Sequence, residues 1–161
     1  MGLPFIYPDN SLDYVENFIL FHAGTQKIIA QNHQFIGVNR ALARFVKRDS
    51  GAKLGVFWHT QGSGKSFSMI FYTRKIQRKL GGNYTFVIVT DREDLDGQIY
   101  RNFLNTGAVS QQDAARPGDS ARLREALGQN KRIVFTLIHK FRTGLFERPL
   151  VDAGRAAEAF Q

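Results

Sequence analysis

The chain contains no cysteine, so neither a disulfide nor a thiolate metal site can form. Its four histidines show no spacing suited to zinc. No apolar run approaches the roughly 20 residues needed to cross a membrane. The opening Met-Gly-Leu-Pro-Phe has neither a basic flank nor an apolar core, which excludes a secretory signal there. The lack of cysteine fits a reducing cytoplasm, and we expect no membrane partner.

Charge is the main compositional feature that is present. The 161 residues are 43% hydrophobic, which suits one domain with a real core. The net charge of +8 and the pI near 10.0 favour a polyanionic partner, and nucleic acid is the first candidate. Charge alone also fits a domain that is merely soluble.

The chain is organised around a glycine-rich turn at residues 59–66, HTQGSGKS. We expect a strand over residues 54–58 before it and a helix over 66–80 after it, the context that makes such a turn a phosphate-binding loop. Its N–H groups and the helix N-terminus would face the phosphates of ATP. The Lys65 ammonium would reach the β- and γ-phosphates, and the Ser66 hydroxyl would ligate Mg²⁺. The turn residues predicted to bind nucleotide are Thr60, Gln61, Gly62, Ser63, Gly64, Lys65 and Ser66.

His59 stands where such a loop usually has Gly or Ala. We favour a packed ring over a polar lid above the nucleotide, because a lone histidine rarely has a special role. The alternative for the whole turn is an ordinary glycine turn between a strand and a helix.

Three helical patterns surround the turn. The first follows the capping residues at 9–11, buries Leu12, Val15, Ile19 and Leu20, and ends at Gly24 or residues 25–26. The second runs over residues 32–48 and buries Phe35, Val38, Leu42, Phe45 and Val46. Its other side carries a basic stripe, Arg40, Arg44, Lys47 and Arg48, which is more often a solvated face than a DNA contact. The helix after the turn is expected to bury Met69, Ile70, Thr73, Ile76 and Leu80 and to expose Arg74, Lys75, Arg78 and Lys79.

Two apolar, β-rich runs, residues 84–90 and 132–138, are typical of strands covered on both faces. Helical stretches at 94–104 and 121–127 separate them, and the polar stretch 105–120 reads as a surface excursion. Strands that alternate with helices predict an α/β fold, with a parallel sheet and helices on both faces.

Five stretches together resemble the restriction (R, HsdR-type) subunit of type I restriction enzymes. They are residues 9–18 (DNSLDYVENF), 32–39 (NHQFIGVN), 58–66 (WHTQGSGKS), 87–98 (VIVTDREDLDGQ) and 135–141 (FTLIHKF). The resemblance implies a superfamily 2 helicase-like translocase, with two RecA-like domains joined to a nuclease domain, that pumps double-stranded DNA with ATP. It also implies modification and specificity subunits as partners and a bacterial or archaeal cytoplasm. Chromatin-remodeller-like motors are a near alternative.

The resemblance also assigns residues. Gln34 resembles the glutamine that reads adenine; otherwise it is a surface glutamine. Lys65 and Ser66 match the phosphate and magnesium ligands. The family's motif Ia, which contacts the backbone of a DNA strand, is matched by Thr90, Asp91, Arg92 and Gln98. The alternative interpretation of these residues is a polar turn that caps the next helix. A further family motif is matched by Thr136, His139 and Lys140. Lys140 could bind a DNA phosphate, and the alternative is a purely structural role.

Residues 1–31 are therefore expected to form a helical lead-in, and residues 32–161 part of a first RecA-like domain. The family's acidic pair, of the Asp-Glu-Ala-His type, is expected soon after residue 141 and does not occur before Gln161. Without it no residue is placed to activate the attacking water. We expect weak nucleotide binding and negligible ATPase activity from these residues alone.

Two other functions remain open. Residues 86–91 form an apolar run that ends in Asp91, so the chain could be a stand-alone P-loop NTPase or phosphotransferase that uses Asp91 for magnesium. It could also be a non-enzymatic, basic nucleic-acid-binding remnant with an empty loop.

Overall fold

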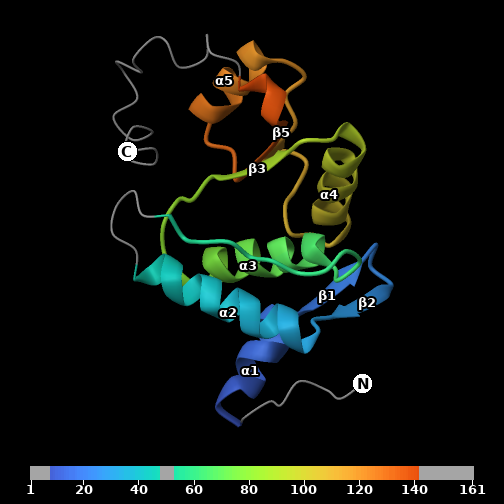
Figure 1. The fold of residues 1–161 in the computed structure, drawn as a ribbon, viewed down its shortest axis with the longest axis vertical. Helices are drawn as coiled ribbons and strands as arrows, with labels where there is room; N and C mark the ends of the chain where they lie inside the picture. Colours follow the sequence, from blue (N-terminus) through green and yellow to red (C-terminus); the bar gives the residue numbers. More distant parts are fainter. Residues whose placement is uncertain (1–7, 48–52, 142–161) are drawn as a thin grey trace. The chain divides into compact units, whose positions relative to one another are not determined.

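The computed structural model describes residues 8–47 and 53–141 (Figure 1). The chain divides into two compact units, which are taken one at a time. The first unit is Met1–Gly82 with Asn105–Ala108, and the second is Asn83–Leu104 with Val109–Gln161. Among the described residues, no helix is long and apolar enough to cross a membrane. Arg48 of the predicted basic stripe lies outside the described residues.

The first unit contains three helices and a hairpin. Helix α1 (Pro8–Asn17) is followed by β1 (Ile19–His22) and β2 (Gln26–Ile29), which pair antiparallel. Helices α2 (Asn32–Val46) and α3 (Lys65–Lys79) follow. The prediction that the first helix continues to about Gly24 is wrong. The backbone groups of Ile19 and Leu20 pair with β2 instead, because Ala23 and Gly24 take positive φ and turn the chain back.

An aromatic cluster forms the core of the first unit. Its rings are Tyr14, Phe18, Phe35 and Phe71, and the Phe18–Phe35 centroids lie 4.7 Å apart. Phe18 directly follows α1, and its N–H donates to the Tyr14 carbonyl at 2.9 Å, so the two residues continue the helical spacing and enter the core on one side. The predicted burial of Leu12 and Val15 is wrong, because these residues lie on the opposite, exposed side.

The buried faces of α2 and α3 agree with the prediction only in part. Phe35 and Val38 are buried, as are Ile70, Thr73 and Ile76, whereas Leu42, Phe45 and Leu80 are half-buried. Val46 and Met69 are exposed. The prediction that Lys75 faces water is wrong, since only 4% of this residue is exposed.

The expected strand at residues 54–58 is not formed. Val56 and Trp58 are largely exposed, and the segment carries no strand pairing in the part of the chain that the structure describes. A strand needs a neighbour to receive its backbone hydrogen bonds, and the described sheet of this unit is the β1–β2 hairpin alone. The segment lies along α2 instead.

The second unit is a parallel α/β layer. Its elements are β3 (Phe86–Thr90), α4 (Glu93–Asn105), β4 (Ala114–Ala115), α5 (Ser120–Gly128) and β5 (Ile133–Leu137), followed by a 3₁₀ turn, Ile138–Lys140. The strand order is β3-β5-β4, with every pair parallel. The predicted α/β class with a parallel sheet is confirmed. The two-residue strand β4 lies inside the stretch predicted to be a surface excursion.

Helices cover both faces of the central strand. Val134 packs with Leu123 and Ala126 of α5, whereas its neighbour Phe135 points to the other face, against Tyr100 and Phe103 of α4. All five residues of β5 are buried, as predicted. The same prediction is wrong for β3, an edge strand whose Val89 is exposed.

Candidate functional site: the glycine-rich loop and its support

The loop at residues 59–66 owes its shape to two glycines. Gly62 has φ +80° and Gly64 has φ +75°, a left-handed conformation that side chains disfavour. The Ser63 N–H donates to the Thr60 carbonyl at 3.3 Å and closes the turn, and Gly64 caps α3. A Cβ on Gly64 would lie 2.8 Å from the Gln34 side-chain nitrogen, so this position also requires glycine for space.

Helix α2 supports the loop and the segment before it along its length. At the C-terminal half of α2, the Arg44 guanidinium donates to the Leu54 carbonyl at 3.2 Å. At mid-helix, the Phe57 ring occupies the place that a Cβ on Gly37 would need. At the N-terminal end, two side chains reach the loop itself. The segment therefore runs antiparallel to α2 and delivers the loop to the start of α3.

Gln34 is one of those two side chains, and it is 4% exposed. Its Nε2 donates to the Gly64 carbonyl at 3.0 Å, and its Oε1 accepts from the Gln31 N–H at 2.8 Å. His33 is the other, with its Nε2 3.1 Å from the Ser63 carbonyl. The alternative of a surface glutamine is therefore wrong. The adenine-reading role stays a prediction, and in this structure the amide holds the loop.

The loop presents donors suited to phosphate. The backbone N–H groups of Gly64, Lys65 and Ser66 have no hydrogen-bond partner among the described residues. The exposed Lys65 ammonium donates to the His59 carbonyl at 2.5 Å and to the Thr60 carbonyl at 3.4 Å. Free N–H groups at the start of a 15-residue helix, beside a lysine that is held only by carbonyls, fit an anionic ligand.

The His59 ring is packed between two aromatic neighbours, as favoured from the sequence. Its centroid lies 4.4 Å from that of Phe57 and 4.6 Å from that of His33. Desolvation lowers the pKa of His59, and the charges of His33 and Lys65 lower it further. The ring is therefore biased toward its neutral form beside the loop.

The motif Ia candidates are in the second unit, at the end of β3 and on α4. Thr90 is buried and its hydroxyl lies 3.5 Å from the Arg92 carbonyl, whereas Asp91 and Gln98 are exposed. Arg92 forms a two-point pair with Asp94, at 3.2 and 2.7 Å. The hydrogen bond from Arg92 is the largest of the effects that lower the pKa of the Asp94 carboxyl.

Lys140 is structurally engaged. Its Nζ donates to the Pro117 carbonyl at 2.7 Å, and its own carbonyl accepts from the Ser120 hydroxyl at 2.8 Å. The lysine thus ties the end of the β5 segment to the start of α5. Of its motif neighbours, Thr136 is buried in β5 and His139 is exposed.

One pair in the TDREDLDGQ stretch was missed from the sequence. Asp96, 1% exposed, accepts from Nε of Arg116 at 2.5 Å. A Cβ on Gly97 would come within 3.4 Å of the Arg116 and Arg101 guanidinium groups, so this glycine leaves room for the pair. A glycine and an acid in the middle of an apolar helical pattern were the available signal, since both disfavour helix interiors.

Within residues 8–47 and 53–141, no group of three or more His, Asp or Glu side chains is arranged to hold a metal ion. Ser66 is the loop hydroxyl closest in sequence to the helix start, and it is half-buried. A cation at the loop would thus depend on this hydroxyl together with ligand oxygens.

Residues 33–156 match a family described as SWI2/SNF2 ATPase. The chain is 42% identical over 145 residues to a type I restriction enzyme HindI endonuclease subunit of Haemophilus influenzae, which covers 83% of this chain and 14% of that protein. It is 32% identical over 141 residues to a putative type I restriction enzyme MjaIXP endonuclease subunit of Methanocaldococcus jannaschii, covering 83% and 13%. The chain therefore spans about a seventh of the length of these relatives. The resemblance to type I restriction subunits seen in the sequence is confirmed.

Proposed function

The chain belongs to the SWI2/SNF2 ATPase family, and from this premise we propose that it is the nucleotide-binding part of an ATP-driven double-stranded DNA translocase in a type I restriction endonuclease subunit. The family membership itself implies the use of ATP. The names of the relatives support the restriction system, since each is an endonuclease subunit of a type I restriction enzyme. The modification and specificity subunits of such a complex would be its partners.

The loop geometry carries the proposal. ATP, when bound, supplies the free energy of γ-phosphate hydrolysis. The N–H groups of Gly64, Lys65 and Ser66 would bind phosphate oxygens, and Lys65 would exchange the His59 and Thr60 carbonyls for the β- and γ-phosphates. Phosphate oxygens carry full negative charge and attract an ammonium group more strongly than neutral carbonyls do.

The remaining loop groups complete the site. The Ser66 hydroxyl would ligate Mg²⁺, which the phosphates would share. Gly62 and the backbone of Thr60, Gln61 and Ser63 would line the phosphates, and Gln34 would read adenine while it keeps its contact with Gly64. The acidic pair of the Asp-Glu-Ala-His type, which would activate the attacking water, does not occur in this sequence. We therefore expect binding without appreciable hydrolysis by this chain alone.

The domain division is part of the proposal. Residues 32–161 would belong to a first RecA-like domain, with residues 1–31, a helix and a hairpin, leading into it. DNA backbone contacts would come from Thr90, Asp91, Arg92, Gln98 and Lys140. Arg92 could turn from Asp94 to a DNA phosphate at little cost, because both side chains of that ion pair are 68% exposed. A stand-alone NTPase built on Asp91 is not favoured, because the relatives are large restriction subunits.

The deciding experiment measures binding of a fluorescent ATP analogue in the presence of Mg²⁺. Lys65→Ala should weaken binding at least about tenfold, since a charge-assisted contact contributes about 1.5–3 kcal/mol. Lys27→Ala removes another exposed lysine of the first unit, on β2, and should leave affinity unchanged. Equal losses for Asp91→Ala and Lys65→Ala would favour the stand-alone enzyme, and binding that does not depend on Lys65 would refute the proposed site.

A further inference from the structure

The basic side of α2 is unexplained by the nucleotide site. We propose that Arg40, Arg44 and Lys47, with Lys53 just beyond them (the α2 stripe), bind the phosphate backbone of duplex DNA, and that α2 couples this contact to the loop. The choice of DNA as the occupant rests on the proposed function. The surface itself rests on charge, exposure and the contacts of α2.

The positive charge of the chain is concentrated in the first unit. Eleven Lys and Arg and four Asp and Glu fall in this unit, so it carries +7 of the net +8. Between residues 17 and 90 the sequence has a single acid, Asp49, which lies outside the described residues. Helix α2 has no acid at all. A solvated helix face usually mixes charges of both signs, so this face departs from the ordinary pattern.

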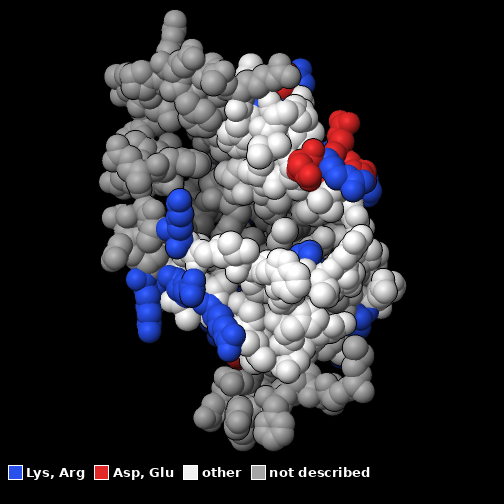
Figure 2. Space-filling view, viewed as in Figure 1, with Lys and Arg blue, Asp and Glu red and all other residues white. Residues whose placement is uncertain are grey.

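The stripe is exposed and free to bind. Arg40, Arg44, Lys47 and Lys53 are all exposed, and Arg40, Lys47 and Lys53 have no hydrogen-bond or ion-pair partner in the described part of the chain. Arg44 uses one Nη on the Leu54 carbonyl and keeps its other donors. Figure 2 shows Lys and Arg side chains gathered over the C-terminal half of α2.

The spacing suits a duplex backbone. At 3.6 residues per turn, Arg40, Arg44 and Lys47 fall within about 60° around the helix. Arg40 and Lys47 are about 10 Å apart along its axis, close to three nucleotide steps of 3.4 Å along a DNA strand. Both arginine and lysine bind phosphate oxygens, arginine with a planar, two-point geometry.

The same helix holds the nucleotide loop. Arg44 bonds to Leu54, where the segment leading to the loop begins, and Gln34 bonds to Gly64 in the loop itself. A shift of α2 on phosphate binding would therefore act on both ends of that segment. Binding of DNA and of nucleotide should then change each other's affinity by the same factor.

The test measures binding of the chain to a fluorescein-labelled 30-base-pair duplex by anisotropy, from about 50 to 200 mM salt. Arg40→Ala with Lys47→Ala should weaken binding at least about tenfold at low salt and reduce the slope of log K against log salt by about two. The charge-keeping double variant Arg40→Lys with Lys47→Arg should restore binding. Unchanged unfolding curves would show that the variants fold.

The matched control is Lys27→Ala with Arg101→Ala, which removes the same charge from exposed positions on β2 and α4. Equal losses in the two double variants would overturn the stripe, because net charge alone would then explain binding. Tighter binding of phosphatidylserine vesicles than of duplex would overturn DNA as the occupant. Equal affinity for the ATP analogue with and without duplex would overturn the coupling.

Failure of this inference differs from failure of the proposed function. If the stripe variants leave duplex affinity unchanged while Lys65→Ala weakens nucleotide binding, only the stripe proposal is overturned. If the stripe variants weaken duplex binding while Lys65→Ala leaves nucleotide affinity unchanged, only the proposed nucleotide site is overturned.

Discussion

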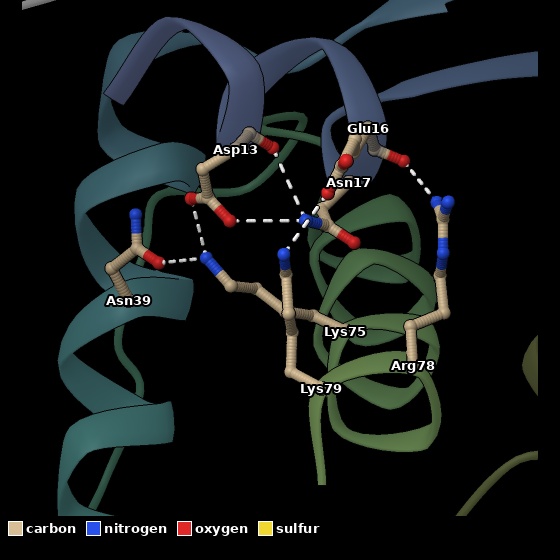
Figure 3. Close-up of polar contacts among 7 residues, drawn as sticks. All are labelled: Asp13, Glu16, Asn17, Asn39, Lys75, Arg78 and Lys79. Carbon is tan, nitrogen blue, oxygen red and sulfur yellow. Dashed lines mark hydrogen bonds and ion pairs between the residues drawn. The ribbon is translucent and has the colours of Figure 1, made fainter. Parts of the chain in front are cut away.

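The Lys75 ammonium of α3 lies 2.5 Å from a carboxylate oxygen of Asp13 in α1, and 5% of the lysine side chain is exposed. The same ammonium donates to Oδ1 of Asn39 in α2 at 2.5 Å and lies 4.9 Å from the Phe18 ring centroid. Figure 3 shows the three helices meeting at this group. A buried charge needs partners, and here α1 supplies a carboxylate and α2 supplies an amide oxygen to the lysine of α3.

A second contact between α1 and α3 lies closer to water. Glu16 pairs with Lys79 at 3.0 Å, and its carbonyl accepts from Arg78 (Figure 3). The side chains of Glu16 and Lys79 are 47% and 46% exposed. The two pairs therefore join the same helices at different depths, which allows a matched comparison.

Asp13→Ala should destabilise the chain by about 3–5 kcal/mol, because it leaves the Lys75 charge buried without its counter-ion. Glu16→Ala should cost only about 0–1 kcal/mol, since an exposed pair is screened by water. Urea unfolding followed by circular dichroism measures both. Similar losses in the two variants would contradict the buried pairing.

Gly64→Ala should reduce nucleotide affinity more than Gly62→Ala does. Both glycines have positive φ, so alanine costs about 1–2 kcal/mol of backbone strain at either position. Only at Gly64 would the Cβ also press on the Gln34 amide, because a Cβ at Gly62 meets nothing within 4 Å. Titration with the ATP analogue tests this order, and equal effects would mean that the contact with Gln34 is unimportant.

Arg116→Ala should destabilise the chain more than Asp96→Asn. The arginine change leaves the Asp96 side chain, which is 2% exposed, without its charged partner. The asparagine is neutral, and the remaining Arg116 side chain, 39% exposed, can reach water. We expect about 3 kcal/mol for the first change and less for the second. The midpoints of thermal or urea unfolding give the order, and the reverse order would exclude this account.

His59 should make stability fall as the pH decreases from about 6.5. Because the folded-state pKa of His59 lies below that of the unfolded chain, the unfolded state binds a proton first and is favoured in this window. His59→Asn should flatten the dependence there. The lowered pKa of Asp94 also favours unfolding in acid, but only as the pH falls toward and below the ordinary carboxyl range. An unchanged slope between pH 7 and 5 in the variant would argue against the shift.

The sequence by itself determined the loop, the helices on either side of it and the two long strands of the parallel sheet. These features depend on local preferences, which a few neighbouring residues determine. They are the glycines at positions 62 and 64, the helical period after Lys65 and the apolar run of β5. Local sequence motifs were also sufficient to identify the resemblance to type I restriction subunits.

Only the tertiary structure decided the burial of Lys75, the hairpin after Asn17 and the packing of residues 54–58 along α2. Asp13 and Lys75 are 62 residues apart, and a helical pattern cannot show that a lysine on its polar side will meet an acid from another helix. In the same way, an apolar run becomes a strand only if a neighbouring strand accepts its backbone hydrogen bonds. These features depend on contacts with residues that are distant in the sequence, which a local pattern does not show.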